Sequence, residues 1–454
     1  MTITWRKMAM NPVIKHRPKF LIKRKNIMKT YCGSRNGFFF FLVFLIFEFG
    51  FSSNVYSGEM ADDHKGHNTI SSSEMGSMDH GNSKMSDNMR PMTMGKSMEM
   101  KRPIRIEEGR AYSPPPALMG TQMGMVETLN VPALGYELDR KVKVFTLIAQ
   151  PMEHVITDGK PMDKSIIPEM NRFSGGMGHM MNLKQKGIVW GYNGSMPGPT
   201  IEATEGDTIR IILKNELPEP TSIHWHGLEV PNAQDGAAGV TEAATLPGET
   251  HIYEFTLYQS GTFMYHSGFN VMKQDALGLG GLVVIHPKDE KNKPDREFAI
   301  MLQEWTFSPG NPNPNLASMA FNWFTFNGKS APSIDIMKIK QGQRVRIRIG
   351  NLSMQSHPIH IHGYAWKVVG TEGGPIPESA QWSGATINVP PGTTRDVEFV
   401  AWNPGVWRFH CHRLHHIMNA MADMPMGIMP HGGMFTLVHV EPKDPNAKWI
   451  HPQQ

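Results

Sequence analysis

A cysteine between two histidines near the C-terminal end of the sequence could supply ligands for a metal centre. Residues 410–412 read His-Cys-His, and His416 and Met421 follow Cys411 at intervals of five residues. One thiolate, two imidazoles and a weak axial thioether form the ligand set of a blue, or type 1, copper site. The segment contains three of these four ligands, and His357, on another strand, is the candidate for the fourth.

Other histidines occur in pairs separated by one residue. The pairs are His224 and His226, His360 and His362, and His410 and His412. Because residues i and i+2 of a strand share a face, each pair is expected to converge on one site. Cys411 would then point to the opposite face from its two neighbours. This short segment would touch two metal sites and connect them covalently.

The histidines form four ordered clusters, of which the remaining one is centred on His266, directly before Ser267 and Gly268. A single histidine in a core is usually satisfied by hydrogen bonds, but an ordered series of clusters favours metal ligation. Structural zinc needs about four ligands, and the eleven candidate ligands in this sequence exceed that number.

An internal repeat positions these clusters. Residues 206–211 resemble residues 342–347, and each segment is followed by a His-X-His-Gly motif. Between these motifs the sequence consists of short β-rich runs separated by Gly and Pro turns, which is typical of β-sandwiches. We therefore predict an all-β fold with two consecutive Greek-key sandwich domains over residues 139–290 and 295–443, followed by a tail over 444–454.

The first part of the sequence predicts export. Residues 1–57 combine a basic start with an apolar run at 37–47, which fits a signal or targeting segment. We expect a periplasmic location, with membrane anchoring by residues 37–51 as the alternative. Cys32 falls in this segment, so Cys411 would be the single cysteine of the mature chain and could form no internal disulfide.

Methionine-rich segments suggest a soft metal. Residues 58–138 are rich in Met and His and poor in branched apolar residues, so we predict a disordered linker that captures copper. The alternative is a flexible tail with chance enrichment in Met. A second Met-rich segment, 418–434, could dock Cu(I) beside the type 1 ligands or could simply pack the core. The formal net charge of +4 resides largely in the first 30 residues and does not indicate nucleic-acid binding.

Over both repeats, about two-thirds of the chain, the sequence resembles the multicopper oxidases, in particular bacterial two-domain, laccase-like copper oxidases. The resemblance implies two cupredoxin domains, up to four copper ions per chain of types 1, 2 and 3, and reduction of O2 to water. It implies a homotrimer with the oxygen-reducing cluster between neighbouring chains.

The resemblance also assigns the ligands residue by residue. It implies type 1 ligation by His357, Cys411, His416 and Met421, type 2 ligation by His224 and His360, and type 3 ligation by His226, His266, His362, His410 and His412. It further suggests that Asp235 lies near the type 2 copper, where it could orient water or donate protons. The alternative for Asp235 is an ordinary turn residue, since Asp-Gly favours turns.

Aligning the two repeats shows two places at which the first repeat lacks an expected ligand. Ser267 aligns with Cys411 and Thr221 with His357, so the first domain is expected to lack a type 1 site. Gly268 stands where the family has a histidine, which leaves five type 3 histidines instead of six. Asn270 or a methionine could substitute, the cluster could be incomplete, or the protein could keep only its blue site.

The predicted function is that of a copper-dependent oxidase. Substrate would donate single electrons at the type 1 copper, and Cys411 would pass them through His410 and His412 to the cluster that reduces O2. Cu(I) is the expected substrate, in copper tolerance, with phenols and Mn(II) as alternatives. A non-enzymatic periplasmic copper-binding or electron-transfer protein is the rival hypothesis. A copper nitrite reductase is disfavoured, because there the blue site lies in the first domain.

Overall fold

The computed structural model describes residues 125–159, 184–419 and 432–446. The predicted targeting segment, most of the predicted linker, the end of the tail and Met421 lie outside these residues. Strands make up nearly all of the regular secondary structure of the described chain, which confirms the predicted all-β fold. In the described part of the chain, no helix is long and apolar enough to cross a membrane.

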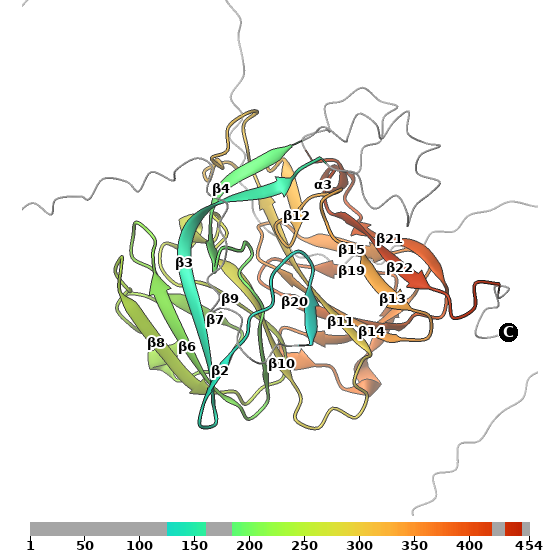
Figure 1. Ribbon diagram of the computed structural model, residues 1–454, viewed down its shortest axis with the longest axis horizontal. Coiled ribbons are helices and arrows are strands. Elements are labelled where there is room, and N and C mark those ends of the chain that lie inside the picture. The colour runs from blue at the N-terminus through green and yellow to red at the C-terminus, as the bar shows by residue number, and fades with distance from the viewer. Residues whose placement is uncertain (1–124, 160–183, 420–431, 447–454) are drawn as a thin grey trace, which may run out of the picture. The chain divides into compact units, whose positions relative to one another are not determined.

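The first domain is a sandwich of a five-stranded and a four-stranded sheet. The five-stranded sheet contains β2 (Glu137–Asp139), β3 (Val142–Thr157), β4 (Gln185–Tyr192), β6 (Thr208–Asn215) and β8 (Thr250–Thr256). The four-stranded sheet contains β5 (Ile201–Thr204), β10 (Gly280–His286), β9 (Gly261–Ser267) and β7 (Ile223–His226). In Figure 1 these strands run from blue-green to yellow. Residues such as Ile209, Ile211 and Leu213 alternate along β6 with more exposed ones, and they fill the core between the sheets.

The second domain packs an eight-stranded sheet on a five-stranded one. The larger sheet contains β1 (Val126–Thr128), β11 (Arg296–Trp305), β12 (Trp323–Phe326), β14 (Arg344–Asn351), β16 (Trp366–Thr371), β17 (Gly374–Pro375), β18 (Trp382–Gly384) and β20 (Thr394–Val400). The smaller sheet contains β13 (Met337–Lys340), β15 (His357–Ile361), β19 (Thr386–Val389), β21 (Gly405–Cys411) and β22 (Phe435–Glu441). These strands are mostly orange to red in Figure 1. Short helices occur at α2 (Val271–Gln274), α3 (Leu414–Met418), η4 (Asn232–Gln234) and η5 (Glu378–Ala380).

Regular structure is present before the predicted domain boundary at residue 139. Residues 126–128 form β1, which pairs in parallel with β11 of the second domain. Two backbone amides here, those of Met125 and Val126, donate to the Glu202 carboxylate at 2.8 and 3.1 Å. The end of the predicted linker is therefore part of the folded unit, because backbone pairing orders a segment whose composition alone gives little sign of a core.

The two sandwiches also pack against each other. Met264, Leu282 and Val284 of the first domain form one buried apolar cluster with Ala299 and Met301 of the second. Burial of this surface fixes the strands that carry the histidines, because β9 contributes Met264 to the junction and His266 to a histidine cluster.

Candidate metal centres

Three predicted type 1 ligands meet at one point in the second domain. His357 begins β15, Cys411 ends β21, and His416 lies in α3. The Cys411 Sγ atom lies 3.5 Å from His416 Nδ1 and 3.9 Å from His357 Nδ1, and the two Nδ1 atoms are 3.0 Å apart. All three residues are fully buried. Their donor atoms lie within 4.8 Å of one another, a triangle that fits a single metal ion.

The remaining ring nitrogens of these two histidines are held by hydrogen-bonding partners. His416 Nε2 lies 3.0 Å from the Gln355 side-chain oxygen, and His357 Nε2 lies 2.8 Å from Ser353 Oγ. The His416 ring also stacks on Phe324, with centroids 3.9 Å apart. Partners on the far nitrogen orient a metal-ligating imidazole and select its tautomer, so both Nδ1 atoms are presented as ligands.

Burial sets the protonation of this centre. It lowers the pKa of His357 to about 3 and that of His416 to about 2, with further lowering from nearby positive groups such as Arg413. It raises the pKa of the Cys411 thiol to about 12. The imidazoles are therefore neutral donors at pH 7, and a bound cation must replace the thiol proton. A soft thiolate with two imidazoles suits copper.

The first domain holds a separate cluster of His224, His226 and His266. β7 pairs with β9 so that His224 lies opposite His266, and His226 Nδ1 is 3.2 Å from His266 Nε2. His224 Nδ1 lies 2.9 Å from the Asp235 carbonyl oxygen and 3.5 Å from its carboxylate. The structure thus places Asp235 beside a predicted type 2 ligand, in the turn at the end of η4.

The second domain repeats this arrangement with His360, His362 and His410. β15 pairs with β21 so that His360 lies opposite His410, the same register as in the first domain. His362 Nε2 is 3.1 Å from His410 Nε2. The ring of His412 lies 5.4 Å from that of His360 by centroids, so it borders the cluster. Cys411 is buried on the other side of β21, as strand alternation predicts.

Among the described residues of one chain, the two histidine clusters stay apart. Each brings three ligand atoms within 4.8 Å of one another, but no such group contains histidines of both domains. Among the described residues, the histidines of the two domains therefore form two separate ligand groups.

The first domain carries a hydrogen-bonded triad where the second has its thiolate centre. Gln274 Oε1 accepts hydrogen bonds from Thr221 Oγ1 at 2.8 Å and from Ser267 Oγ at 2.5 Å, and all three residues are fully buried. Thr221 and Ser267 are the residues that align with His357 and Cys411. The triad has neither sulfur nor imidazole. Gln274 has no motif in the sequence that would have indicated it.

Gly268 has no room for a side chain. A Cβ atom there would lie 1.9 Å from the Gly236 carbonyl oxygen and 2.7 Å from Ser222 Oγ. Its own carbonyl accepts from Ala238 N at 3.2 Å, which fixes the turn. The histidine that the resemblance led us to expect at this position is therefore excluded by packing in this chain.

Two acidic residues near the clusters were not predicted. Asp275 Oδ2 lies 3.0 Å from His266 Nδ1 and orients that ring. Glu304 Oε2 lies 3.9 Å from His357 Nε2, while Glu304 Oε1 accepts from Met354 N at 2.8 Å. Burial raises the pKa of Glu304 to about 7. No local spacing links either residue to a histidine motif, so only the fold identifies them.

A cavity of about 250 Å³ opens beside Glu304 and Ser353, next to the His357 ligand. Three methionines on its wall are exposed, Met272 by 86%, Met319 by 60% and Met354 by 62%. By contrast Met434, which belongs to the predicted Met-rich docking segment, is fully buried in the second-domain core. For Met434 the docking interpretation is wrong, because its side chain packs between the sheets.

Comparisons with known proteins agree with this arrangement. Two family models described as multicopper oxidase match residues 176–290 and 306–424. Copper resistance protein A of Escherichia coli is 38% identical over 138 residues, 30% of this chain and 22% of that protein. A probable nitrite reductase-hydroxylamine oxidoreductase fusion protein of Kuenenia stuttgartiensis is 30% identical over 265 residues, 52% of this chain and 29% of its own length. The chain thus spans less than a third of these curated relatives.

Solved structures match over more of their length. The blue copper oxidase of Nitrosomonas europaea is 25% identical, with a TM-score of 0.52, over 68% of this chain and 92% of that one. The multicopper oxidase mgLAC is 25% identical, with a TM-score of 0.54, over 67% and 88%. Since each family model covers most of one sandwich together with its histidine cluster, the chain belongs to the multicopper oxidase family, in its two-domain, laccase-like group.

Proposed function

We propose that this protein oxidises Cu(I), one electron at a time, with O2 as the final electron acceptor and water as the product, in copper tolerance. When bound, copper supplies one-electron transfer at the His357–Cys411–His416 centre and the reduction of O2 at the histidine clusters. The observation that carries the proposal is the position of Cys411. Its side chain belongs to the buried centre, while its neighbour His410 belongs to the cluster on the other face of β21.

The methionine-lined cavity supports Cu(I) as the donor. Thioether sulfur favours Cu(I) over harder cations. The cavity also reaches Glu304, whose carboxylate lies 3.9 Å from the His357 ring. The same cavity is lined by Ser353, whose hydroxyl lies 2.8 Å from Nε2 of the type 1 ligand His357. The name of the copper resistance protein A relatives agrees with a role in copper tolerance.

Oxygen uptake by the copper-loaded protein tests this function directly. We expect uptake with Cu(I) and with an organic one-electron dye, and loss of both in Cys411→Ser. Replacing Met272, Met319 and Met354 together by Leu should raise the KM for Cu(I) at least ~10-fold and leave dye oxidation within ~2-fold, because only Cu(I) needs sulfur ligands. Met125→Leu is the matched control, since Met125 is also exposed but contacts Lys293 instead of this cavity.

Equal loss with both donors would contradict a Cu(I) site in this cavity. Preferential use of phenols or Mn(II) would replace Cu(I) as the substrate. Deletion of residues 58–124, which leaves β1 in place, and separately of the methionines at 424–429, should depress Cu(I) oxidation more than dye oxidation if those segments deliver copper.

A homotrimer is part of the proposal, supported by the separation of the two histidine clusters within one chain. Mixing two inactive variants tests it. A chain with His224→Ala and His226→Ala, combined with a chain with His360→Ala and His362→Ala, should regain part of the oxygen uptake, because some interfaces would pair two intact clusters. A monomeric mass by light scattering, or no recovery after mixing and reassembly, would contradict the shared site.

Gly268 favours a second candidate function, a copper-binding or electron-transfer protein without oxygen reduction. Packing excludes a histidine there, so the type 3 ligand set is one short. A copper content near one per chain, with a type 1 absorption but no oxygen uptake, would select this candidate. A nitrite reductase stays disfavoured, since the first domain holds the Thr221–Gln274–Ser267 triad where that enzyme class has its blue site.

Export to the periplasm is proposed from residues 1–57 alone. Cell fractionation with an antibody against the folded domains tests it: protein retained in the cytoplasm would contradict export, and protein in the membrane fraction would favour anchoring by residues 37–51.

A further inference from the structure

Two buried polar atoms face each other at the junction of the sandwiches, away from the copper centres. His286 ends β10 and Glu297 lies near the start of β11. His286 Nδ1 and Glu297 Oε1 are 3.8 Å apart, and neither makes a hydrogen bond with any described residue. The Glu297 side chain is 3% exposed. An unpaired polar atom at such depth costs free energy unless something satisfies it.

The other nitrogen of His286 decides what each atom offers. His286 Nε2 lies 2.7 Å from Glu202 Oε1, and the Glu202 carboxylate also accepts hydrogen bonds from two backbone amides. A neutral imidazole that donates from Nε2 to a carboxylate presents a lone pair at Nδ1. That lone pair faces a carboxylate oxygen of Glu297. Two hydrogen-bond acceptors therefore face each other, and a cation between them would satisfy both.

A third ligand completes the group. One carboxylate oxygen of Glu290 lies within 4.8 Å of the ligand atoms of His286 and Glu297. Arginines hold both carboxylates in place: Arg348 Nε donates to Glu297 Oε2 at 2.7 Å, and Arg346 Nη2 lies 2.6 Å from Glu290 Oε1. Arg346 Nη1 lies 3.9 Å from Glu297 Oε1, too far for a hydrogen bond.

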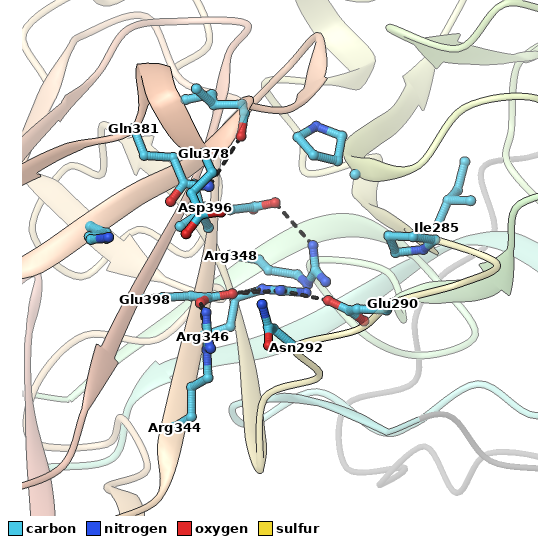
Figure 2. A pocket seen from close by; sticks show the side chains of 16 residues that line it. Ile285, Glu290, Asn292, Arg344, Arg346, Arg348, Glu378, Gln381, Asp396 and Glu398 are labelled. Atoms are coloured by element: carbon cyan, nitrogen blue, oxygen red, sulfur yellow. Dashed lines mark hydrogen bonds and ion pairs between the residues drawn. The ribbon is translucent and has the colours of Figure 1, made fainter. Parts of the chain in front are cut away.

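A cavity of about 220 Å³ borders this group through Glu290, and Ile285 and Pro287, the chain neighbours of His286, also line it. Figure 2 shows Glu290 on its wall, joined to Arg346, with Glu398 on the opposite side. The charged residues on the wall comprise four acids and four bases, namely Glu290, Glu378, Asp396 and Glu398 with Arg344, Arg346, Arg348 and Lys367. Glu202 and Glu297, which flank His286, add two carboxylates to this balanced set. A divalent cation would neutralise them.

We propose that His286, Glu290 and Glu297 bind a divalent transition-metal ion of the zinc class, at a site independent of copper and of the oxidase function. One imidazole and two carboxylates suit Zn²⁺ and exclude a preference for Ca²⁺ or Mg²⁺, which take oxygen ligands. No sulfur is present to favour Cu(I). Because His286 belongs to the first sandwich and Glu297 to the second, the ion would pin the two domains together.

Zinc binding to the copper-loaded full-length protein tests the site, since copper already fills the other histidine clusters. Bound zinc is measured by mass spectrometry after gel filtration, and the melting temperature is followed with added Zn²⁺ or Ca²⁺. We expect one Zn²⁺ per chain and a higher melting temperature with Zn²⁺ but not with Ca²⁺. His286→Gln and Glu297→Gln should weaken zinc binding at least ~10-fold while the type 1 absorption stays unchanged.

Two further variants keep the test decisive. Glu290→Gln alters a ligand on the cavity wall and should weaken zinc binding even if Glu297→Gln folds poorly. Glu254→Gln removes an exposed carboxylate paired with Arg210 and should bind zinc like the parent. A parent that binds no zinc and shows no thermal shift would mean that only a proton lies between His286 and Glu297. That result, or zinc binding unaffected in His286→Gln and Glu290→Gln, would overturn the proposal.

Discussion

Burial determines the protonation state of individual histidines in this fold, and His154 is the clearest case outside the candidate metal centres. It lies on β3, and its Nε2 donates to the carbonyl oxygen of Gly328 in the second domain at 2.8 Å. Burial, followed by the charge of Lys329, lowers its pKa to about 3. Between about pH 6.5 and pH 3 the folded protein therefore keeps His154 neutral, while the unfolded chain, with a pKa near 6.5, gains a proton.

His154→Gln should make the copper-free protein less sensitive to acid. The stability that neutral His154 allows is fully present above pH ~6.5 and is lost as the pH falls towards 3, by up to about 1.4 kcal/mol per pH unit, because the unfolded state binds one more proton. Glutamine does not titrate and can still donate to Gly328. The free energy of unfolding, measured with urea at pH 6.5, 5.5 and 4.5, should fall less steeply with decreasing pH in the variant than in the parent. The difference in slope should correspond to about one proton. The same slope in both proteins would contradict this account.

The strands that carry the candidate ligands are equivalent in the two domains, but the chain continues differently after each of them. β9 and β21 each pair with a His-X-His strand in the same register, His224 opposite His266 and His360 opposite His410. After β21 the chain turns into α3, which brings His416 to Cys411. After β9 it turns at Gly268 into α2, which brings Gln274 to Ser267. Strand ends, not strand interiors, therefore determine which domain can hold the thiolate centre.

Gly268→Ala should destabilise the first domain and its histidine cluster. The added Cβ would meet the Gly236 carbonyl oxygen at 1.9 Å, so the turn after β9 must shift. We expect a loss of about 2–4 kcal/mol in the free energy of unfolding, in the upper range for single substitutions. Copper at the first-domain cluster should decrease, while the type 1 absorption should persist.

Gly373→Ala is the matched control, because a Cβ there meets only Thr371 Oγ1 at 3.7 Å. It should change stability by no more than about 0.5 kcal/mol. Denaturant unfolding and copper analysis compare the stability and the copper content of the two variants. A Gly268→Ala protein as stable as the control would show that the turn can shift to accommodate a Cβ atom at little cost.

At the scale of the whole molecule, buried ion pairs join the two sandwiches. Arg348 on β14 is 2% exposed, and it binds Glu297, Asp396 and the Thr262 hydroxyl of the first domain at 2.7, 3.0 and 2.9 Å. Thr262 Oγ1 in turn donates to Asp396 at 2.6 Å. Since β9 carries both Thr262 and His266, this network ties a histidine cluster of one domain to the sheet of the other.

Arg348→Leu should cost about 3–5 kcal/mol, because it leaves Glu297 and Asp396 buried without their cationic partner. The loss should concentrate at the junction, so thermal unfolding should separate into two transitions. Arg344→Leu is the comparison, since Arg344 is 42% exposed and shares Glu398 with Arg346. Its cost should not exceed about 1 kcal/mol. Calorimetry on both variants measures the difference, and similar melting curves would contradict the assigned role of Arg348.

Local sequence was informative wherever the chemistry lies within a few residues of one strand. The His-X-His pairs, Cys411 between its two neighbours and the repeat all follow from the two-residue period of a strand, and the all-β fold was predicted from the same pattern. Residues that lie outside these motifs and contact the sites only in the folded chain have no comparable pattern in the sequence. Asp275, Gln274 and Glu304 are ordinary polar residues in the sequence, and only packing brings them to His266, Ser267 and His357.

By itself the sequence determined which donor side chains are available to a metal and the order of the two repeats, because a metal centre needs particular donor atoms and a repeat preserves their spacing. Tertiary structure alone decided three other matters. It separated the histidine clusters of one chain, it closed the Gly268 position to any side chain, and it placed His286 against Glu297 across the domain junction. Each depends on distances between segments far apart in the chain, which only the packing of the two sandwiches fixes.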